Sequence, residues 1–159
     1  PEGEKYFEPS RARTVDANFI PAAALMNDAY CLKCHADIFK SHMHSAHKFS
    51  SFNNPAYLFS VRETRKVAKE RDGNVKASRW CAGCHDVVPF VTGAFDNANY
   101  DDVNDPTAHA GLTCTVCHAI TALHGTVGHG GYTIEEPAPL PQAKRQNPPF
   151  QCATTPLVT

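Results

Sequence analysis

Apolar and polar residues follow a helical period in three stretches of the chain. Residues 57–71 mix apolar and charged positions and end before an Asp-Gly pair, so they predict a helix that stops there. Residues 36–49 predict a second helix, and residues 22–29 predict a short one. An Asn-Asn-Pro turn at residues 53–55 separates the two longer helices. The pattern predicts a mainly α-helical and irregular fold with little β-structure.

The chain divides into three segments by composition. Its 159 residues fit one domain. Residues 1–29 show little periodicity and predict an extended N-terminal arm, whereas residues 30–136 hold most of the helical pattern. Residues 137–159 are rich in proline, which a helix or a central strand does not tolerate, so they predict an extended C-terminal tail.

The charge of the chain argues against two classes of partner. The formal net charge is -1, so we expect neither nucleic-acid binding nor a polybasic membrane contact. No apolar run reaches the length of about 18 residues that indicates a transmembrane helix.

Residues 93–108 are rich in Asp and Asn, which makes calcium a minor candidate ligand. They lack the Gly and the final Glu of an EF-hand loop, so a polar surface loop is the preferred interpretation.

The cysteines carry the clearest chemical signal. The chain has seven cysteines and nine histidines. Six of the cysteines form three pairs with two residues between the members, and a histidine follows each pair directly. This CxxCH spacing is the attachment signature of c-type haem, and about 0.02 such matches are expected by chance from this composition. The three motifs are Cys31, Cys34 and His35; Cys81, Cys84 and His85; and Cys114, Cys117 and His118.

The spacing of each motif matches the shape of a haem. Two intervening residues let one backbone turn present both sulfurs to the two vinyl groups on one haem edge, and the following histidine can then bind the iron. Zinc ribbons place their pairs about 15–20 residues apart and need no histidine after each pair. A thioredoxin-like motif occurs once, near a βαβ pattern, and structural disulfides do not explain the histidines. We therefore expect three covalently bound haem c groups, with the three motif histidines as proximal ligands.

Three haems in a chain of this length lead to further expectations. The porphyrins should form much of the apolar core of a small multihaem cytochrome c, so their loss should unfold the chain. Haem c is attached after export, in an oxidising compartment, so we expect a periplasmic or extracellular protein. The odd cysteine, Cys152, indicates either a free thiol or an intermolecular disulfide.

Six histidines remain as candidates for the second axial ligand of each iron. The only methionines are Met26 and Met43, so the histidines favour bis-histidine ligation, which gives lower potentials than His/Met ligation. Glycines around His124 and His129 allow the backbone to approach a flat ring closely. In decreasing order of preference, the distal candidates are His47, His44, His124, His109, His129 and His42.

The positions of two candidates limit which iron they can bind. In a straight helix, which rises about 1.5 Å per residue, His44 and His47 would lie roughly 13–18 Å from His35. The two axial nitrogens of one haem are only about 4 Å apart, since each Fe–N bond is about 2 Å. Three residues apart, the two candidates would also share a helix face. We therefore expect them to bind the haem of another motif or of another chain.

Three segments resemble a known group of proteins. They are Ser45–Pro55 (SAHKFSSFNNP), Arg79–His85 (RWCAGCH) and Gly111–His118 (GLTCTVCH). They are similar to the haem-binding region of larger extracytoplasmic multihaem c-type cytochromes related to the tetrahaem and octahaem proteins of nitrogen metabolism, over residues 27–137. The resemblance implies that His47, in the Ser-Ala-His segment, is a distal ligand. Larger members continue into further CxxCH motifs, so the resemblance does not carry over a catalytic role.

Electron transfer is the function that these expectations favour. Closely spaced bis-histidine haems exchange electrons and leave no open coordination site for a substrate. The partners would be other redox proteins or copies of the same chain, and the surplus histidines and extended ends suit a subunit of an extracellular cytochrome filament. A discrete periplasmic electron shuttle or complex subunit is the main alternative. A fragment of a nitrite or hydroxylamine oxidoreductase would need a five-coordinate haem, so we expect no enzyme activity. A haem-based sensor would need a signalling module.

Overall fold

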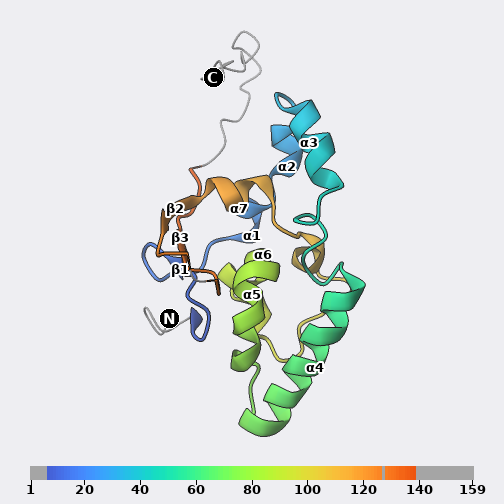
Figure 1. Ribbon diagram of the computed structural model, residues 1–159, viewed down its shortest axis with the longest axis vertical. Helices are drawn as coiled ribbons and strands as arrows, with labels where there is room; N and C mark the ends of the chain where they lie inside the picture. The colour runs from blue at the N-terminus through green and yellow to red at the C-terminus, as the bar shows by residue number, and fades with distance from the viewer. Residues whose placement is uncertain (1–6, 127, 139–159) are drawn as a thin grey trace.

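A computed structural model of the chain describes residues 7–126 and 128–138 (Figure 1). The helices are α1 (Ala22–Leu25), α2 (Asp28–Cys31), α3 (Ala36–Met43), α4 (Pro55–Asp72), α5 (Arg79–His85), α6 (Val87–Val91) and α7 (Cys114–His118). The 3₁₀ helices are η2 (Lys76–Ser78), η3 (Ala94–Asp96) and η4 (Pro106–His109). The strands are β1 (Arg13–Thr14), β2 (Ile120–Leu123) and β3 (Tyr132–Ile134). The described chain is therefore mainly helical with little β-structure, as the sequence predicts.

The ends of α4, the longest helix, follow from its sequence. Asn54 is the N-cap, because its side chain accepts hydrogen bonds from the backbone N–H groups of Ala56 and Tyr57. Pro55 occupies the first helical position, where its missing N–H costs nothing. Gly73 ends the helix in the left-handed conformation, with φ 70°. The helix predicted after the Asn-Asn-Pro turn is confirmed.

The helix predicted over residues 36–49 is wrong in its second part. α3 stops early, and His44 is its C-cap with φ -109°. Turns follow, in which the carbonyl and hydroxyl oxygens of Ser45 both accept the backbone N–H of Lys48. A serine that bonds nearby backbone in this way competes with continuation of the helix. His44 and His47 therefore do not share a helix face, and the distance calculated along a helix does not apply to His47.

The short helix predicted over residues 22–29 is divided in two. Asn27 lies between α1 and α2, and its side-chain amide donates hydrogen bonds to the carbonyl groups of Ala23 and Ala24. These bonds satisfy carbonyl groups at the end of α1 that have no partner within the helix. The chain therefore changes direction at Asn27 before the first cysteine motif.

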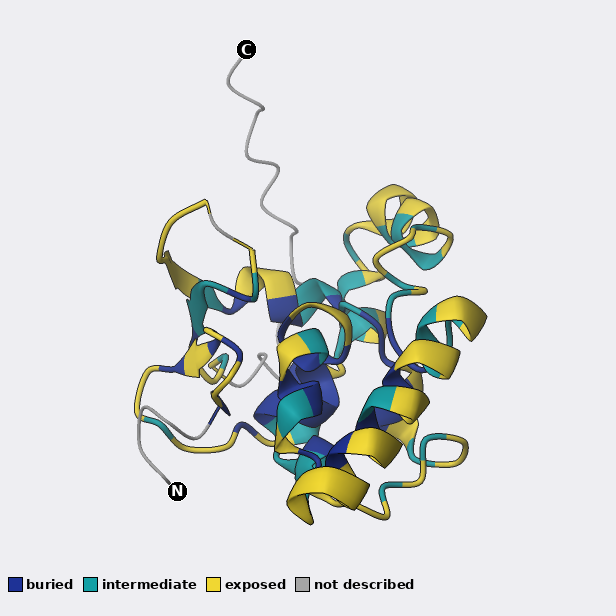
Figure 2. Ribbon diagram, turned by 60° about the horizontal axis from the view of Figure 1, so that its bottom comes forward, coloured by how far each residue is buried: buried dark blue, intermediate teal, exposed yellow. Residues whose placement is uncertain are grey.

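The apolar core surrounds α6, in which every residue is buried (Figure 2). Phe7, Ile20 and Leu25 bury their side chains in the same cluster, and β1 pairs in parallel with β3, which pairs antiparallel with β2. Residues 7–29, for which the sequence predicts an extended arm, are thus packed into the fold. The tail predicted from residue 139 onward, with Cys152, lies outside the described residues.

α2 and α3 stand at one end of the molecule, away from α6 (Figure 1). Neither helix contains a buried residue. Among the helices of the described ranges, none is long and apolar enough to cross a membrane. The predicted core of porphyrins stays a prediction, since the core described here is made by the chain's own side chains.

Candidate functional site

The second cysteine motif lies on α5. Cys81, Cys84 and His85 are three and four residues apart, so their side chains share one side of the helix. Cys84 and His85 are exposed, whereas Cys81 is partly buried. Gly83 faces Ser10 so closely that a Cβ on the glycine would lie 2.2 Å from the serine Oγ. The N-terminal segment therefore packs directly against this motif, and a side chain at position 83 would require Ser10 to move.

The ring of His85 is held in a fixed orientation. Its Nδ1 lies 2.7 Å from the carbonyl oxygen of Ser50, so an Nδ1–H donated there leaves Nε2 as a ligand for a metal. The ring stacks on Tyr57 with centroids 4.2 Å apart and an interplanar angle of 11°. The hydroxyls of Tyr57 and Ser51 both donate to the carboxylate of Asp86. These contacts position the imidazole from two sides.

Asp86, directly after this motif, is fully buried. Burial raises its pKa to about 6, although the hydrogen bonds from Ser51 and Tyr57 act in the opposite direction. Burial also raises the pKa of Tyr57, and the carboxylate of Asp86 adds to this effect. No sequence pattern singles out this carboxyl beyond its position after His85, because its two hydroxyl partners are 29 and 35 residues away.

The third motif lies on α7, which begins at a capping threonine. The Thr113 hydroxyl accepts the backbone N–H of Val116 and donates to the carbonyl oxygen of Leu25 at 2.6 Å. This residue therefore caps α7 and joins it to the end of α1. Cys117 and His118 are exposed, so the outer side of the motif is open to a bound group.

The first motif forms a tight turn between two helices. The backbone N–H groups of Cys34 and His35 both donate to the carbonyl oxygen of Cys31, at 3.2 and 2.9 Å. His35 is exposed and is the N-cap of α3. Cys34 is disulfide-bonded, whereas the five other cysteines of the described ranges are free thiols. A thioether at Cys34 would require this sulfur in its reduced form.

The fold brings the first and third motifs together. A carboxylate oxygen of Asp28 accepts the backbone N–H of Cys114 at 2.8 Å. Burial, the Asp28 carboxylate and a hydrogen-bond contact with Cys31 raise the pKa of the Cys114 thiol to about 12. Burial also raises the pKa of Cys117 and of Cys81. Such thiols are protonated at neutral pH, unlike the thiolates of redox-active CxxC motifs.

The Ser-Ala-His segment lies against the chain that leads into α7. The backbone N–H of Leu112 donates to the carbonyl oxygen of His47 at 2.9 Å. Gly111 has φ +60°, and a Cβ there would lie 2.2 Å from the carbonyl oxygen of Lys48. A larger residue would therefore separate the two segments. The structure thus places exposed His47 next to the third motif, although it lies on a turn.

Three other distal candidates are engaged with the protein. The Nε2 atom of His109 lies 2.8 Å from the carbonyl oxygen of Val103, and that of His124 lies 2.6 Å from the hydroxyl of Thr133. The ring of His129 packs on Trp80, beside the second motif, with centroids 3.8 Å apart. His129 also has φ 74°, which is a strained conformation for a residue with a side chain.

The last two candidates lie at the end of α3. His44 is exposed, whereas His42 is partly buried. A ring nitrogen of His42 lies within 4.8 Å of the sulfur of Cys114. The structure therefore places His42, the least favoured candidate in the sequence, beside the third motif.

Large apolar side chains next to the motifs are exposed. Leu32 lies within the first motif and is 40% exposed, Ile38 follows it and is 61% exposed, and Trp80 precedes the second motif and is 46% exposed. These side chains are available to pack against an apolar group bound at the first or second motif. The surroundings of the motifs therefore fit a planar apolar group such as a haem.

The acidic residues of the 93–108 loop bond to the protein itself. Arg79 pairs with Asp96 at 2.7 Å, and Arg62 pairs with Asp102 at 2.6 Å. Across the described ranges, no three carboxylates of this loop lie close enough to share a metal ion. The structure gives no support to calcium binding there, and the loop is a polar surface segment.

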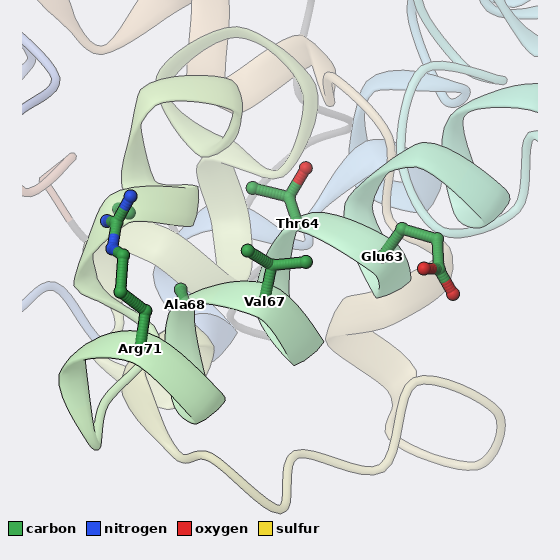
Figure 3. Close-up of a pocket in the computed structure, with 6 residues that line it drawn as sticks. Glu63, Thr64, Val67, Ala68 and Arg71 are labelled. Carbon is green, nitrogen blue, oxygen red and sulfur yellow. The ribbon is translucent and has the colours of Figure 1, made fainter.

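A groove lies on α4 and η2, away from the cysteine motifs (Figure 3). Its lining combines charged and apolar side chains but includes no cysteine or histidine. The lining residues are Glu63, Thr64, Val67, Ala68, Arg71 and Ala77.

Comparisons of the chain with family models, with curated proteins and with solved structures found no match.

Proposed function

We propose that this protein is a trihaem c-type cytochrome that transfers electrons. The observation that carries the proposal is the threefold CxxCH sequence. The local geometry supports it, because each motif occupies a single backbone turn whose histidine is exposed. A resident haem would also explain the apolar side chains that stand exposed beside the first two motifs.

The residues of each motif have distinct roles in this proposal. Each free cysteine S–H would add across a haem vinyl group, so that the S–H bond and the C=C π bond are replaced by a C–S and a C–H bond and no oxidant is needed. Cys34, which is disulfide-bonded, would first have to be reduced by a thiol reductant. The protonated state of Cys81, Cys114 and Cys117 is the state from which this addition starts. His85 offers Nε2 to the iron while its Nδ1 is held by the carbonyl of Ser50. Haem c supplies a one-electron iron couple when bound.

The spare histidines favour a carrier over an enzyme. A catalytic haem needs an open coordination position, and six histidines beyond the motifs are available to close three such positions. His42 and His47 both lie next to the third motif. We therefore propose low-spin, bis-histidine irons that exchange electrons with redox proteins outside the cell membrane or with copies of the same chain.

Intact mass and optical spectra test the attachment of haem. The exported protein should have the mass of the chain plus three haems, and its pyridine haemochrome should give three c-type haems per chain. A replacement of Cys81 and Cys84 by alanine should reduce both counts to two. A mass equal to the bare chain would refute the proposal.

Ligand addition tests the carrier role. Nitrite, cyanide and carbon monoxide should leave the spectrum unchanged if every iron has two histidine ligands. A high-spin signal in the native protein, or a shift with any of these ligands, would favour an enzyme. Electron microscopy of the same preparation separates a filament from discrete particles.

A further inference from the structure

Three polar groups converge where α2, α3 and α7 meet. Ligand atoms of Asp28, His42 and Cys114 all lie within 4.8 Å of one another, and this is the one such group of His, Cys and carboxylate side chains within the described ranges. The Nε2 atom of His42 is buried and has no hydrogen-bond partner. A buried polar atom without a partner is unfavourable, so this nitrogen is a candidate to bind a group that enters the site.

Asp28 and His42 each have one buried atom without a hydrogen-bond partner, Oδ2 and Nε2, but Asp28 has a charged neighbour. One oxygen of Asp28 accepts the backbone N–H of Cys114 at 2.8 Å, and the other lies 3.6 Å from the Nζ of Lys48. Lys48 is itself fixed, because its Nζ donates to the carbonyl oxygen of Ala110 at 2.8 Å. The charge of Asp28 is therefore balanced by Lys48, although its Oδ2 accepts no hydrogen bond, whereas the Nε2 of His42 has no hydrogen-bond partner and is free to bind a ligand.

The chemistry of Cys114 decides what that partner is. A zinc ion would need the thiolate of Cys114 as a ligand. If Cys114 is the first attachment sulfur of the third motif, it becomes a thioether and loses that capacity. The imidazole of His42 is then the strong donor that remains beside the attached group.

We propose that His42 is the distal ligand of the iron held by the third motif, opposite His118. This inference rests on the proposed function, because it assumes that Cys114 and Cys117 carry a haem. It also links two motifs: His42 lies on the helix that follows the first motif, and Cys31 of that motif contacts Cys114. The first and third haems would then be adjacent and would exchange electrons directly.

The test is His42→Ala in the full haem-loaded chain, with Lys40→Ala on the same helix as the matched control. We expect His42→Ala to keep three haems by mass, while about one third of the ferric iron becomes high-spin by electron paramagnetic resonance. Added imidazole should restore the low-spin signal. Lys40→Ala should stay fully low-spin.

Three low-spin irons in His42→Ala would overturn the proposal, and the same test on His44→Ala and His47→Ala would identify the ligand instead. If His42→Ala loses haem, His42→Met replaces it, and one of the three potentials should rise because of His/Met ligation. Three unchanged potentials would again overturn the assignment. A wild-type chain without attached haem would instead mean that the proposed function had failed.

Discussion

The second and first motifs have the same sequence pattern but very different surroundings. The second lies on α5, whose residues Ala82 and Gly83 are buried and which is followed directly by the fully buried α6. The first lies between α2 and α3, which contain no buried residue. Figure 2 shows a buried centre in dark blue, whereas α2 and α3 contain only intermediate and exposed residues.

The difference indicates where a haem would matter for the fold. At the second motif, the protein's own core and the contacts of His85 with Ser50 and Tyr57 set the ligand in place before any group binds. At the first motif, Leu32 and Ile38 have little protein to pack against. In the proposed cytochrome, the haem of the first motif would therefore supply the missing core.

The largest expected effect tests the core behind the second motif. Phe90 is 1% exposed and packs edge-on against Phe7 and Phe95, with centroids 5.2 and 6.1 Å away. Phe90→Ala should lower the free energy of unfolding by about 3–5 kcal/mol, measured by urea denaturation. Phe59→Ala, at a position that is 71% exposed, is the control and should change it by less than about 0.5 kcal/mol. Equal effects would mean that α6 is not the centre of the core.

The second prediction concerns pH. Burial raises the pKa of Asp86 from 3.8 to about 6, so the folded state holds this proton more tightly than the unfolded state. The resulting stabilisation is complete below pH 3.8 and is lost as the pH rises through about 6, which amounts to about 3 kcal/mol. Asp86→Asn should remove this part of the pH dependence. The unfolding free energies of the wild type and of Asp86→Asn are measured by urea denaturation at about pH 4 and about pH 7. The same change between the two pH values in both proteins would contradict the raised pKa.

The third prediction compares two tyrosines. Tyr57 donates to a carboxylate, whereas Tyr100 shares a hydrogen bond of 2.6 Å with the neutral hydroxyl of Thr107. Tyr57→Phe should therefore cost about 1.5–3 kcal/mol of unfolding free energy, and Tyr100→Phe about 0.5–1.5 kcal/mol. Tyr57→Phe should also broaden the signals of the His85 ring in the diamagnetic, reduced protein. A greater loss in Tyr100→Phe would show that the network around the second motif does not hold its histidine.

The smallest effect tests the first motif. Ile38 and Phe59 are similarly exposed, at 61% and 71%. If a haem covers Ile38, then Ile38→Ala should destabilise the haem-loaded protein by about 1 kcal/mol or more, whereas Phe59→Ala should not. Measurement by urea denaturation of the two variants side by side decides the point. No difference between them would remove the argument that haem completes the fold there.

Much of the helical structure could be predicted from local signals. The cap at Asn54, the proline after it and the glycine at position 73 define α4 without any tertiary contact. The prediction failed at the end of α3, where Ser45 bonds to the backbone of Lys48 and a turn replaces the expected helix. The burial of side chains within residues 7–29 could not be predicted locally, because it depends on partners far along the chain, such as β3.

The sequence by itself determined the three CxxCH motifs on which the haem proposal depends, since this spacing is a property of one backbone turn and needs no distant residue. It also supplied six histidines beyond the three that follow the cysteine pairs. Only the tertiary structure decided which of these histidines lie next to a motif and which have ring nitrogens that contact the protein. The Nε2 of His42 is buried beside Cys114, and the Nε2 of His109 contacts the carbonyl oxygen of Val103. Tyr57 stacks on His85 and donates to Asp86. The physical reason is that ligand choice depends on burial and on contacts between segments up to about 90 residues apart, which no local pattern encodes.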